Sequence, residues 1–157
     1  MFHVSSLRGF GLECLLQLNV REMNQQKTNN TGRDRNDGAL IYVVDDEPML
    51  LELAVIVLEP IGYNVKTFRD PKAALDAFGK AEKPPALLIT DYAMHLMNGL
   101  ELMTACRGIN PGQKILMISG TVDEKIFRNA PCKPNRFLTK PYQAKQLVEA
   151  VKSLLAA

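Results

Sequence analysis

The sequence predicts an α/β fold with a doubly wound, five-stranded parallel sheet and five helices. From residue 39 onward, short apolar runs alternate with stretches whose apolar residues recur at helical spacing. Several of the runs are apolar on both faces, as the buried strands of a parallel sheet are. Four of the five runs end in chemically active side chains, at the position where doubly wound folds bind their ligands.

The first strand is expected within residues 39–47, a run rich in β-branched residues that ends in three acids. Pro48 then opens a helix with apolar residues at helical spacing, which closes at Pro60 or Gly62. Residues 63–68 form a second predicted strand, and its polar interruptions are typical of a strand at the edge of a sheet.

Asp70 and Pro71 supply an N-cap and a first helical position for the next helix. A third strand over residues 86–91 ends in Asp91, and a helix over 98–108 follows it. The remaining predicted elements are a fourth strand over 114–119, a short helix over 122–129 with Thr121 and Glu124 as its capping box, a fifth strand over 136–140 and a last helix over 144–155.

Residues 1–38 differ in composition from the rest of the chain. From residue 24 to residue 38 nothing is apolar enough to repay the entropy of ordering, so we expect a flexible leader and a domain over 39–157. A secretory signal in the apolar patch of residues 7–20 is the alternative, but polar residues interrupt that patch. A translation start at Met23 also stays open.

The chain length, the net charge and the cysteine spacing exclude several classes of protein. With 157 residues the chain forms one domain, and its net charge of +2 predicts no strong attraction to nucleic acid or to membrane surfaces. No apolar run approaches the roughly 20 residues of a transmembrane helix. Cys14, Cys106 and Cys132 are widely spaced, which indicates neither a zinc site nor a disulfide framework and favours a reduced, cytoplasmic setting.

Asp45, Asp46 and Glu47 place three negative charges at the end of the first strand. Like charges this close raise one another's pKa unless a cation offsets them, and clustered oxygen ligands suit Mg²⁺. An acidic N-cap for the helix that begins at Pro48 explains the same residues equally well.

The ends of the other strands favour the metal site. Because the carboxyl ends of parallel strands meet at one edge of the sheet, five side chains should converge there. They are Asp45, Asp46, Asp91, Ser119 and Lys140. Three carboxylates with Mg²⁺, a lysine and a hydroxyl predict an aspartate oxygen that accepts a phosphoryl group.

From about Ala39 to Ala157 the chain resembles the response-regulator receiver domains of two-component signalling. The residues that carry the resemblance are the pair Asp45-Asp46, the run Asp-Tyr-Ala-Met-His-Leu-Met-Asn-Gly from Asp91, Ser119-Gly120, and Phe-Leu-Thr-Lys-Pro from Phe137. The resemblance implies the flavodoxin-like, CheY-like fold with strand order 2-1-3-4-5.

The resemblance also implies roles for single residues. They are Asp91 as phosphoacceptor; Asp46, Asp91 and the Ala93 carbonyl as Mg²⁺ ligands, with Asp45 acting through water; Ser119 and Lys140 as contacts to the phosphoryl oxygens; and Phe137 with Ser119 as the switch. The donor would be a histidine kinase or a histidine phosphotransfer protein. By this resemblance the chain is no enzyme acting on other substrates, because it catalyses only its own phosphorylation and dephosphorylation.

The chain departs from the family pattern in three places. His95 stands where proline is usual, as an exposed loop side chain or as a group that alters how fast the phosphoryl group is lost. Ala93 offers no side-chain hydrogen bond to a hydrolytic water. The stretch over residues 129–136, which contains Pro131 and Pro134, replaces the usual approach to the fifth strand and predicts an atypical output surface.

Three functions remain to be weighed. Only one helix follows Lys140, so we expect a stand-alone receiver that binds another protein, with no DNA-binding domain attached. A pseudo-receiver that binds partners without phosphorylation is the second hypothesis. A phosphatase of the haloacid dehalogenase type is the third, but it needs Asp-x-Asp-x-Thr after the first strand, and Asp45-Asp46-Glu47-Pro48 does not match.

Overall fold

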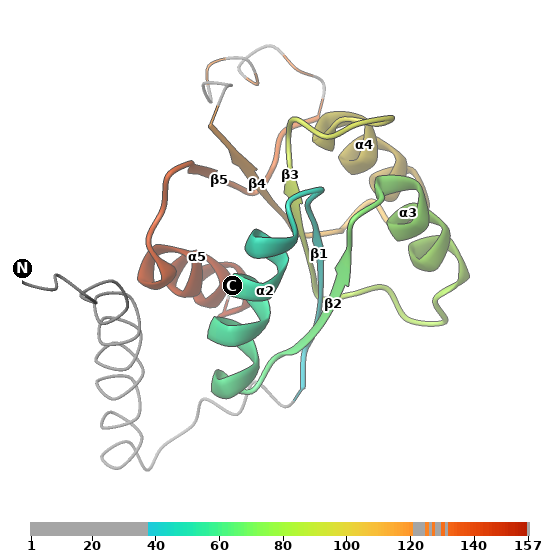
Figure 1. The fold of residues 1–157 in the computed structure, drawn as a ribbon. Coiled ribbons are helices and arrows are strands. Elements are labelled where there is room, and N and C mark those ends of the chain that lie inside the picture. Colours follow the sequence, from blue (N-terminus) through green and yellow to red (C-terminus); the bar gives the residue numbers. More distant parts are fainter. Residues whose placement is uncertain (1–37, 121–124, 126, 128–129, 131, 157) are drawn as a thin grey trace, which may run out of the picture. The chain divides into compact units, whose positions relative to one another are not determined.

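The computed structural model describes residues 38–120, 125, 127, 130 and 132–156. They form one parallel sheet in the order β2-β1-β3-β4-β5, which confirms the predicted fold (Figure 1). The strands are β1 (Leu40–Val44), β2 (Asn64–Phe68), β3 (Leu87–Asp91), β4 (Ile115–Ser119) and β5 (Arg136–Thr139).

Four α-helices and one 3₁₀ helix lie within the described part of the chain. They are α2 (Pro48–Leu58), η2 (Glu59–Ile61), α3 (Pro71–Lys80), α4 (Gly99–Ile109) and α5 (Ala144–Ala156). Three sequence predictions fall wholly or mostly outside the described residues. They are the helix over 122–129, its capping box of Thr121 and Glu124, and the leader over 1–38, of which only residue 38 is described. None of the helices described is long and apolar enough to cross a membrane.

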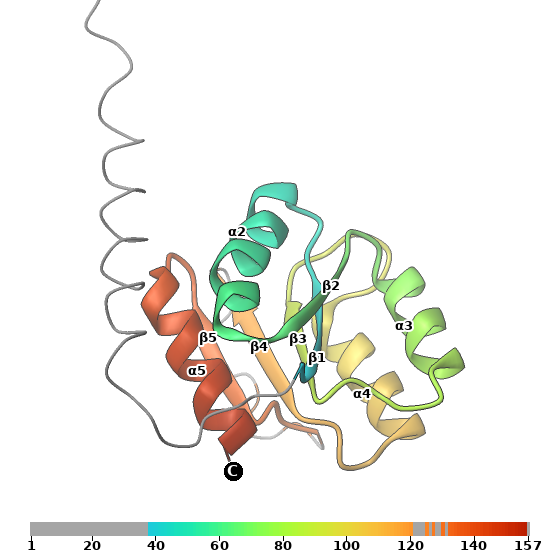
Figure 2. The ribbon, with the colours of Figure 1, turned by 90° about the horizontal axis from the view of Figure 1, so that it is seen from below.

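The helices cover both faces of the sheet. Helices α2 and α5 lie on one face, and α3 and α4 lie on the other (Figure 2). Alternate residues of β1 enter the two apolar layers: Ile41 and Val43 pack towards α2 and α5, whereas Tyr42 and Val44 pack towards α3 and α4. Strand β1 is therefore buried on both faces, as its unbroken apolar run predicts.

The helix starts follow from local capping chemistry. The Asp70 side chain accepts a hydrogen bond from the Lys72 backbone N–H at 2.9 Å, with Pro71 at the first helical position of α3. At the start of α4, Asn98 and Glu101 form a reciprocal capping box. These caps fix where α3 and α4 leave the sheet, and therefore where the loops between strands and helices lie.

One arginine joins the end of α4 to the start of β5. The Arg107 guanidinium donates to the Lys133 carbonyl, to Asn135 Oδ1 at 2.8 Å and, from Nε, to the Gln113 carbonyl at 3.3 Å. Asn135 also pairs with Ile115, because its Oδ1 accepts from the Ile115 N–H at 2.8 Å and its own N–H donates to the Ile115 carbonyl at 2.9 Å. Asn135 thus extends the pairing of β4 and β5 by one position.

Candidate functional site

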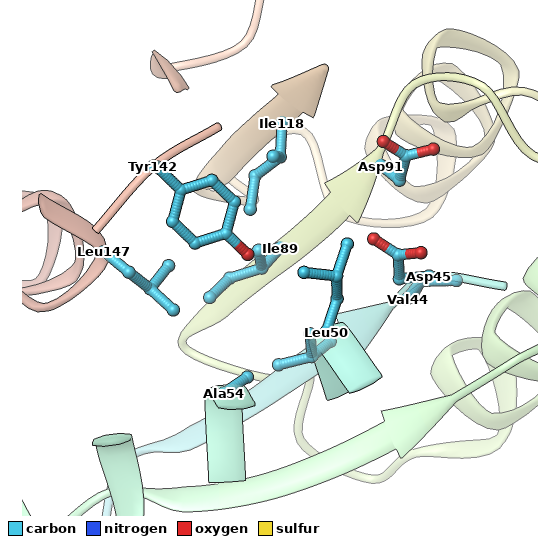
Figure 3. A pocket seen from close by; sticks show the side chains of 10 residues that line it. Val44, Asp45, Leu50, Ala54, Ile89, Asp91, Ile118, Tyr142 and Leu147 are labelled. Atoms are coloured by element: carbon cyan, nitrogen blue, oxygen red, sulfur yellow. The ribbon is translucent and has the colours of Figure 1, made fainter. Parts of the chain in front are cut away.

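The three predicted carboxylates meet at the carboxyl edge of the sheet. Asp45 directly follows β1 and Asp91 is the last residue of β3, so that both side chains point to the same edge in Figure 3. Asp45, Asp46 and Asp91 each offer an oxygen, and these three oxygens lie within 4.8 Å of one another. Asp45 and Asp91 are buried, while the side chain of Asp46 is 30% exposed.

Lys140 lies between two of these acids. It follows β5 directly, and its Nζ is 3.0 Å from Asp91 Oδ1 and 3.2 Å from Asp45 Oδ2. A longer contact of 3.6 Å joins the same Nζ to Glu47 Oε1. When the three aspartates are ionised, the one ammonium still leaves two negative charges to be offset, and Glu47 adds a third.

Glu47 occupies the N-cap position of α2, but its side chain makes no capping hydrogen bond. Its backbone N–H instead donates to Asp45 Oδ1 at 2.9 Å. Glu47 therefore does not serve as a side-chain cap for α2. Its backbone N–H contacts Asp45 and its carboxylate contacts Lys140, and these two residues follow β1 and β5 directly.

Ser119 lies on β4, the neighbour of the strand that carries Asp91, and Phe137 lies on β5, one strand further out. Ser119 is the fully buried last residue of β4, and its carbonyl accepts from the Lys140 N–H at 2.8 Å. Phe137, half-buried on β5, has its ring centre 5.9 Å from that of Phe127, which lies 6.1 Å from the ring of Tyr92. A chain of three aromatic rings therefore links the residue after Asp91 to β5.

Burial dominates the electrostatics of the two inner acids. Burial raises the pKa of Asp45, against the opposing effects of the Glu47 N–H and of Lys140. Burial also raises the pKa of Asp91, although Lys140 and the Ala93 backbone N–H stabilise its charged form. For Lys140, burial lowers the pKa, but the hydrogen bond to Asp91 and the charges of Asp45 and Asp91 outweigh it, and the net direction is upward.

An apolar cavity backs the two acids. Asp45 and Asp91 lie at its rim, and Leu50, Ile89 and Tyr142 are among the side chains that line it (Figure 3). This apolar backing keeps water away from the inner side of the carboxylates, which is the physical origin of their raised pKa values. Burial likewise raises the pKa of the Cys106 thiol, to about 11, so that this cysteine behaves as a packing residue.

The donor set fits a hard divalent cation. Carboxylate oxygens from three residues converge, two of them are held in place by hydrogen bonds, and the net charge at this edge is negative. Met94 and Met97 pack against the apolar layer beside α3 and α4, which marks them as packing residues and not as ligands.

Sequence reasoning missed one contact of this site. His95 is exposed, as expected for a loop side chain, yet its Nδ1 lies 2.9 Å from Asp46 Oδ2. The two residues are 49 positions apart, so no local pattern could pair them. The unusual histidine at this position was the single signal available in the sequence.

The raised pKa values predict how stability depends on pH without metal. A carboxyl group whose folded pKa is raised contributes stability that is fully present below its unfolded pKa, 3.8 for Asp91, and is lost as the pH rises through the folded value. Asp91→Asn removes this loss. In EDTA, the variant should exceed the wild type in free energy of unfolding by about 1 kcal/mol at pH 7. Urea denaturation at several pH values measures the difference.

The excess in free energy of unfolding of Asp91→Asn over the wild type should become smaller towards pH 4, where the wild-type carboxyl group takes up its proton. The exposed change Asp76→Asn on α3 serves as a control and should show no such trend. An Asp91→Asn advantage that stays constant with pH would show that ionisation of Asp91 is not its source.

Solved structures define the class of protein first. The chain aligns with a receiver domain protein from Clostridium thermocellum at 25% identity and a TM-score of 0.69, over 75% of this chain and 94% of that one. It also aligns with the response regulator TrrA of Thermotoga maritima, solved in complex with Mg²⁺ and BeF, at 29% identity and a TM-score of 0.64, over 74% of this chain and 98% of that one. The fold is that of CheY-like receiver domains.

The family follows from the sequence comparison. Residues 41–152 match the response regulator receiver domain, and the chain belongs to this family. The response regulator receiver protein CpdR of Brucella abortus is 31% identical over 74% of this chain and 97% of its own length. The probable transcriptional regulatory protein TcrX of Mycobacterium tuberculosis is 29% identical over 77% of this chain, which spans 52% of TcrX. The predicted resemblance is therefore confirmed.

Proposed function

We propose that Asp91 accepts a phosphoryl group from a histidine kinase or a histidine phosphotransfer protein, in a reaction that depends on Mg²⁺. The phosphorylated form then signals by binding another protein differently or by passing the phosphoryl group on. One observation carries this proposal: Lys140 Nζ lies 3.0 Å from Asp91 Oδ1, within an edge that holds three carboxylates. That edge combines a nucleophilic oxygen, a cation site and a positive donor.

The chemistry assigns a task to each group. An oxygen of Asp91 attacks the phosphorus of a phosphohistidine, an O–P bond forms as the P–N bond breaks, and the donor imidazole leaves with the electron pair. The ammonium of Lys140 and the hydroxyl of Ser119 would then donate to phosphoryl oxygens, where negative charge is spread during transfer. Asp46, Asp91 and the Ala93 carbonyl would hold Mg²⁺, with Asp45 acting through water. When bound, the ion supplies charge neutralisation at the transferring group.

The signal would leave the site along β4 and β5. Phosphorylation would change the contacts of the Ser119 and Lys140 side chains with the site. The backbones of these two residues are joined by the hydrogen bond from the Lys140 N–H to the Ser119 carbonyl. The ring contacts of Tyr92, Phe127 and Phe137 support Phe137 as the switch that changes the partner surface. The match to nearly the whole length of CpdR, a response regulator receiver protein, supports a role as a receiver.

Intact mass measurement after incubation with Mg²⁺ and acetyl phosphate tests the proposal. The wild type should gain one phosphoryl group, and the gain should vanish in EDTA and in Asp91→Asn. Asp76→Asn makes the same chemical change on the exposed face of α3 and should behave like the wild type.

Three results would contradict the proposal. Phosphoryl uptake by Asp91→Asn would place the acceptor elsewhere. A folded wild type that gains no mass would favour a pseudo-receiver, which binds its partner without phosphorylation. Continuous release of inorganic phosphate from simple phosphomonoesters would instead support the hydrolase hypothesis.

A further inference from the structure

The three carboxylates of the site are held unequally. Asp45 accepts from the Glu47 N–H at 2.9 Å and contacts Lys140, and Asp91 contacts Lys140 at 3.0 Å. Both of these side chains are 6% exposed, so the packing around them also restricts their rotation. Asp46 is 30% exposed, and the contact described for its carboxylate is with His95. The geometry of Asp46 therefore depends on a residue of the loop between β3 and α4.

That loop is built in a way that fixes the backbone at His95. The Met97 N–H donates to the His95 carbonyl at 2.9 Å, which closes a γ-turn with Leu96 at its centre. Leu96 has a φ of 71°, in the left-handed region that a leucine adopts only under constraint. The Gly99 N–H donates to the Tyr92 carbonyl at 2.9 Å and closes the base of the loop. His95 thus stands on a constrained turn.

The hydrogen-bond chemistry of the pair allows a cation to bind at the same time. An ionised carboxylate only accepts hydrogen bonds, so that His95 Nδ1 carries the proton and donates to Asp46 Oδ2. A carboxylate offers about four lone-pair positions, and one bond to His95 leaves the others to a metal ion. Outer hydrogen bonds of this kind orient ligating groups, and their removal typically weakens metal binding about 10- to 100-fold.

We propose that His95 is a positioning residue for the divalent cation, which it serves by holding the Asp46 carboxylate in the orientation that binds the ion. This inference rests on the metal site of the proposed function and extends it to a residue outside the ligand set. Because His95 is 93% exposed, its removal should leave the fold unchanged and act on the ion through Asp46 alone.

Two replacements of His95 separate the hydrogen bond from the bulk of the side chain. His95→Leu keeps a side chain of similar size but has no donor. His95→Asn places an amide N–H close to the position of the imidazole Nδ1 and retains a donor. Titration calorimetry of the wild type and both variants with Mg²⁺ and with Mn²⁺, at one pH and without a phosphodonor, measures the dissociation constants. Urea denaturation in EDTA checks that the fold is intact.

The expected result is a loss of about tenfold in affinity for both ions in His95→Leu, with near wild-type affinity in His95→Asn. Unchanged or tighter binding by His95→Leu would overturn the inference and leave the metal site itself in place. A loss confined to Mn²⁺, without rescue by asparagine, would overturn it too, because that result marks direct ligation by the imidazole nitrogen. A wild type that binds neither ion would refute the metal site of the proposed function, and this inference with it.

Discussion

Replacing Gly99 with alanine is expected to lower the free energy of unfolding by about 3 kcal/mol. A Cβ on Gly99 would press against the backbone carbonyl oxygen of Asp91, and it would lie 2.8 Å from Met117 Sδ and 3.0 Å from Tyr92 Cα. The methionine could turn away, but the backbone contacts can be relieved only by moving the end of β3 or the start of α4. Because Asp91 lies there, phosphoryl uptake should fall as well. Urea denaturation and intact mass give the two readings.

Gly108 provides a matched control within the same helix. A Cβ at this position would meet nothing within 4 Å, so Gly108→Ala should raise the free energy of unfolding by about 0.5 to 1 kcal/mol through the helix propensity of alanine. Uptake should be unchanged. The two replacements are expected to change the free energy of unfolding in opposite directions. A Gly99→Ala protein as stable as the wild type would show that the backbone around Gly99 yields easily.

Replacing Lys140 with methionine is expected to lower the free energy of unfolding by about 3 kcal/mol at pH 7 in EDTA. The change keeps most of the apolar stem but removes the ammonium that lies between Asp45 and Asp91. The two buried carboxylates then face each other without a compensating charge, and their pKa values should rise further. Phosphoryl uptake should fall by a factor on the order of 100 to 1,000, because a donor to the transferring group is lost.

The pH dependence separates charge from packing in this variant. Asp45 and Asp91 have raised folded pKa values, so the loss of stability in Lys140→Met grows as the pH rises through these values. The difference in free energy of unfolding between the variant and the wild type should therefore become smaller towards pH 4. The exposed change Lys152→Met on α5 should alter stability by less than about 0.5 kcal/mol at either pH. A gap of the same size at both pH values would assign the loss to packing.

Much of the fold could be predicted because its signals are local. Strand β1 was predicted from five successive apolar residues, the start of α3 from Asp70-Pro71, and the edge position of β2 from its polar interruptions. The meeting of Asp45, Asp46 and Asp91 followed from one topological rule about where parallel strands end. Each of these inferences needs only neighbouring residues or the order of elements.

The contacts that escaped prediction join distant residues through irregular backbone. The His95–Asp46 pair depends on the path of a constrained turn, and periodicity does not report that path. The contacts of Arg107 with Lys133 and Asn135 also give no pattern in the sequence, because an arginine near a helix end is typical of any solvated terminus. The packing of the chain, rather than its local propensities, selects such partners.

The contacts of Arg107 and Asn135 also bear on how this family can diversify. They hold the chain at Ile115, at the start of β4, and at Asn135, just before β5. The pairing of Asn135 with Ile115 therefore helps to set the register of β5. The entropy of closing a loop rises by only about 0.6 kcal/mol for each doubling of its length. Connections of different length between β4 and β5 should therefore cost little loop-closure entropy, while the contacts between Asn135 and Ile115 keep the register of β5.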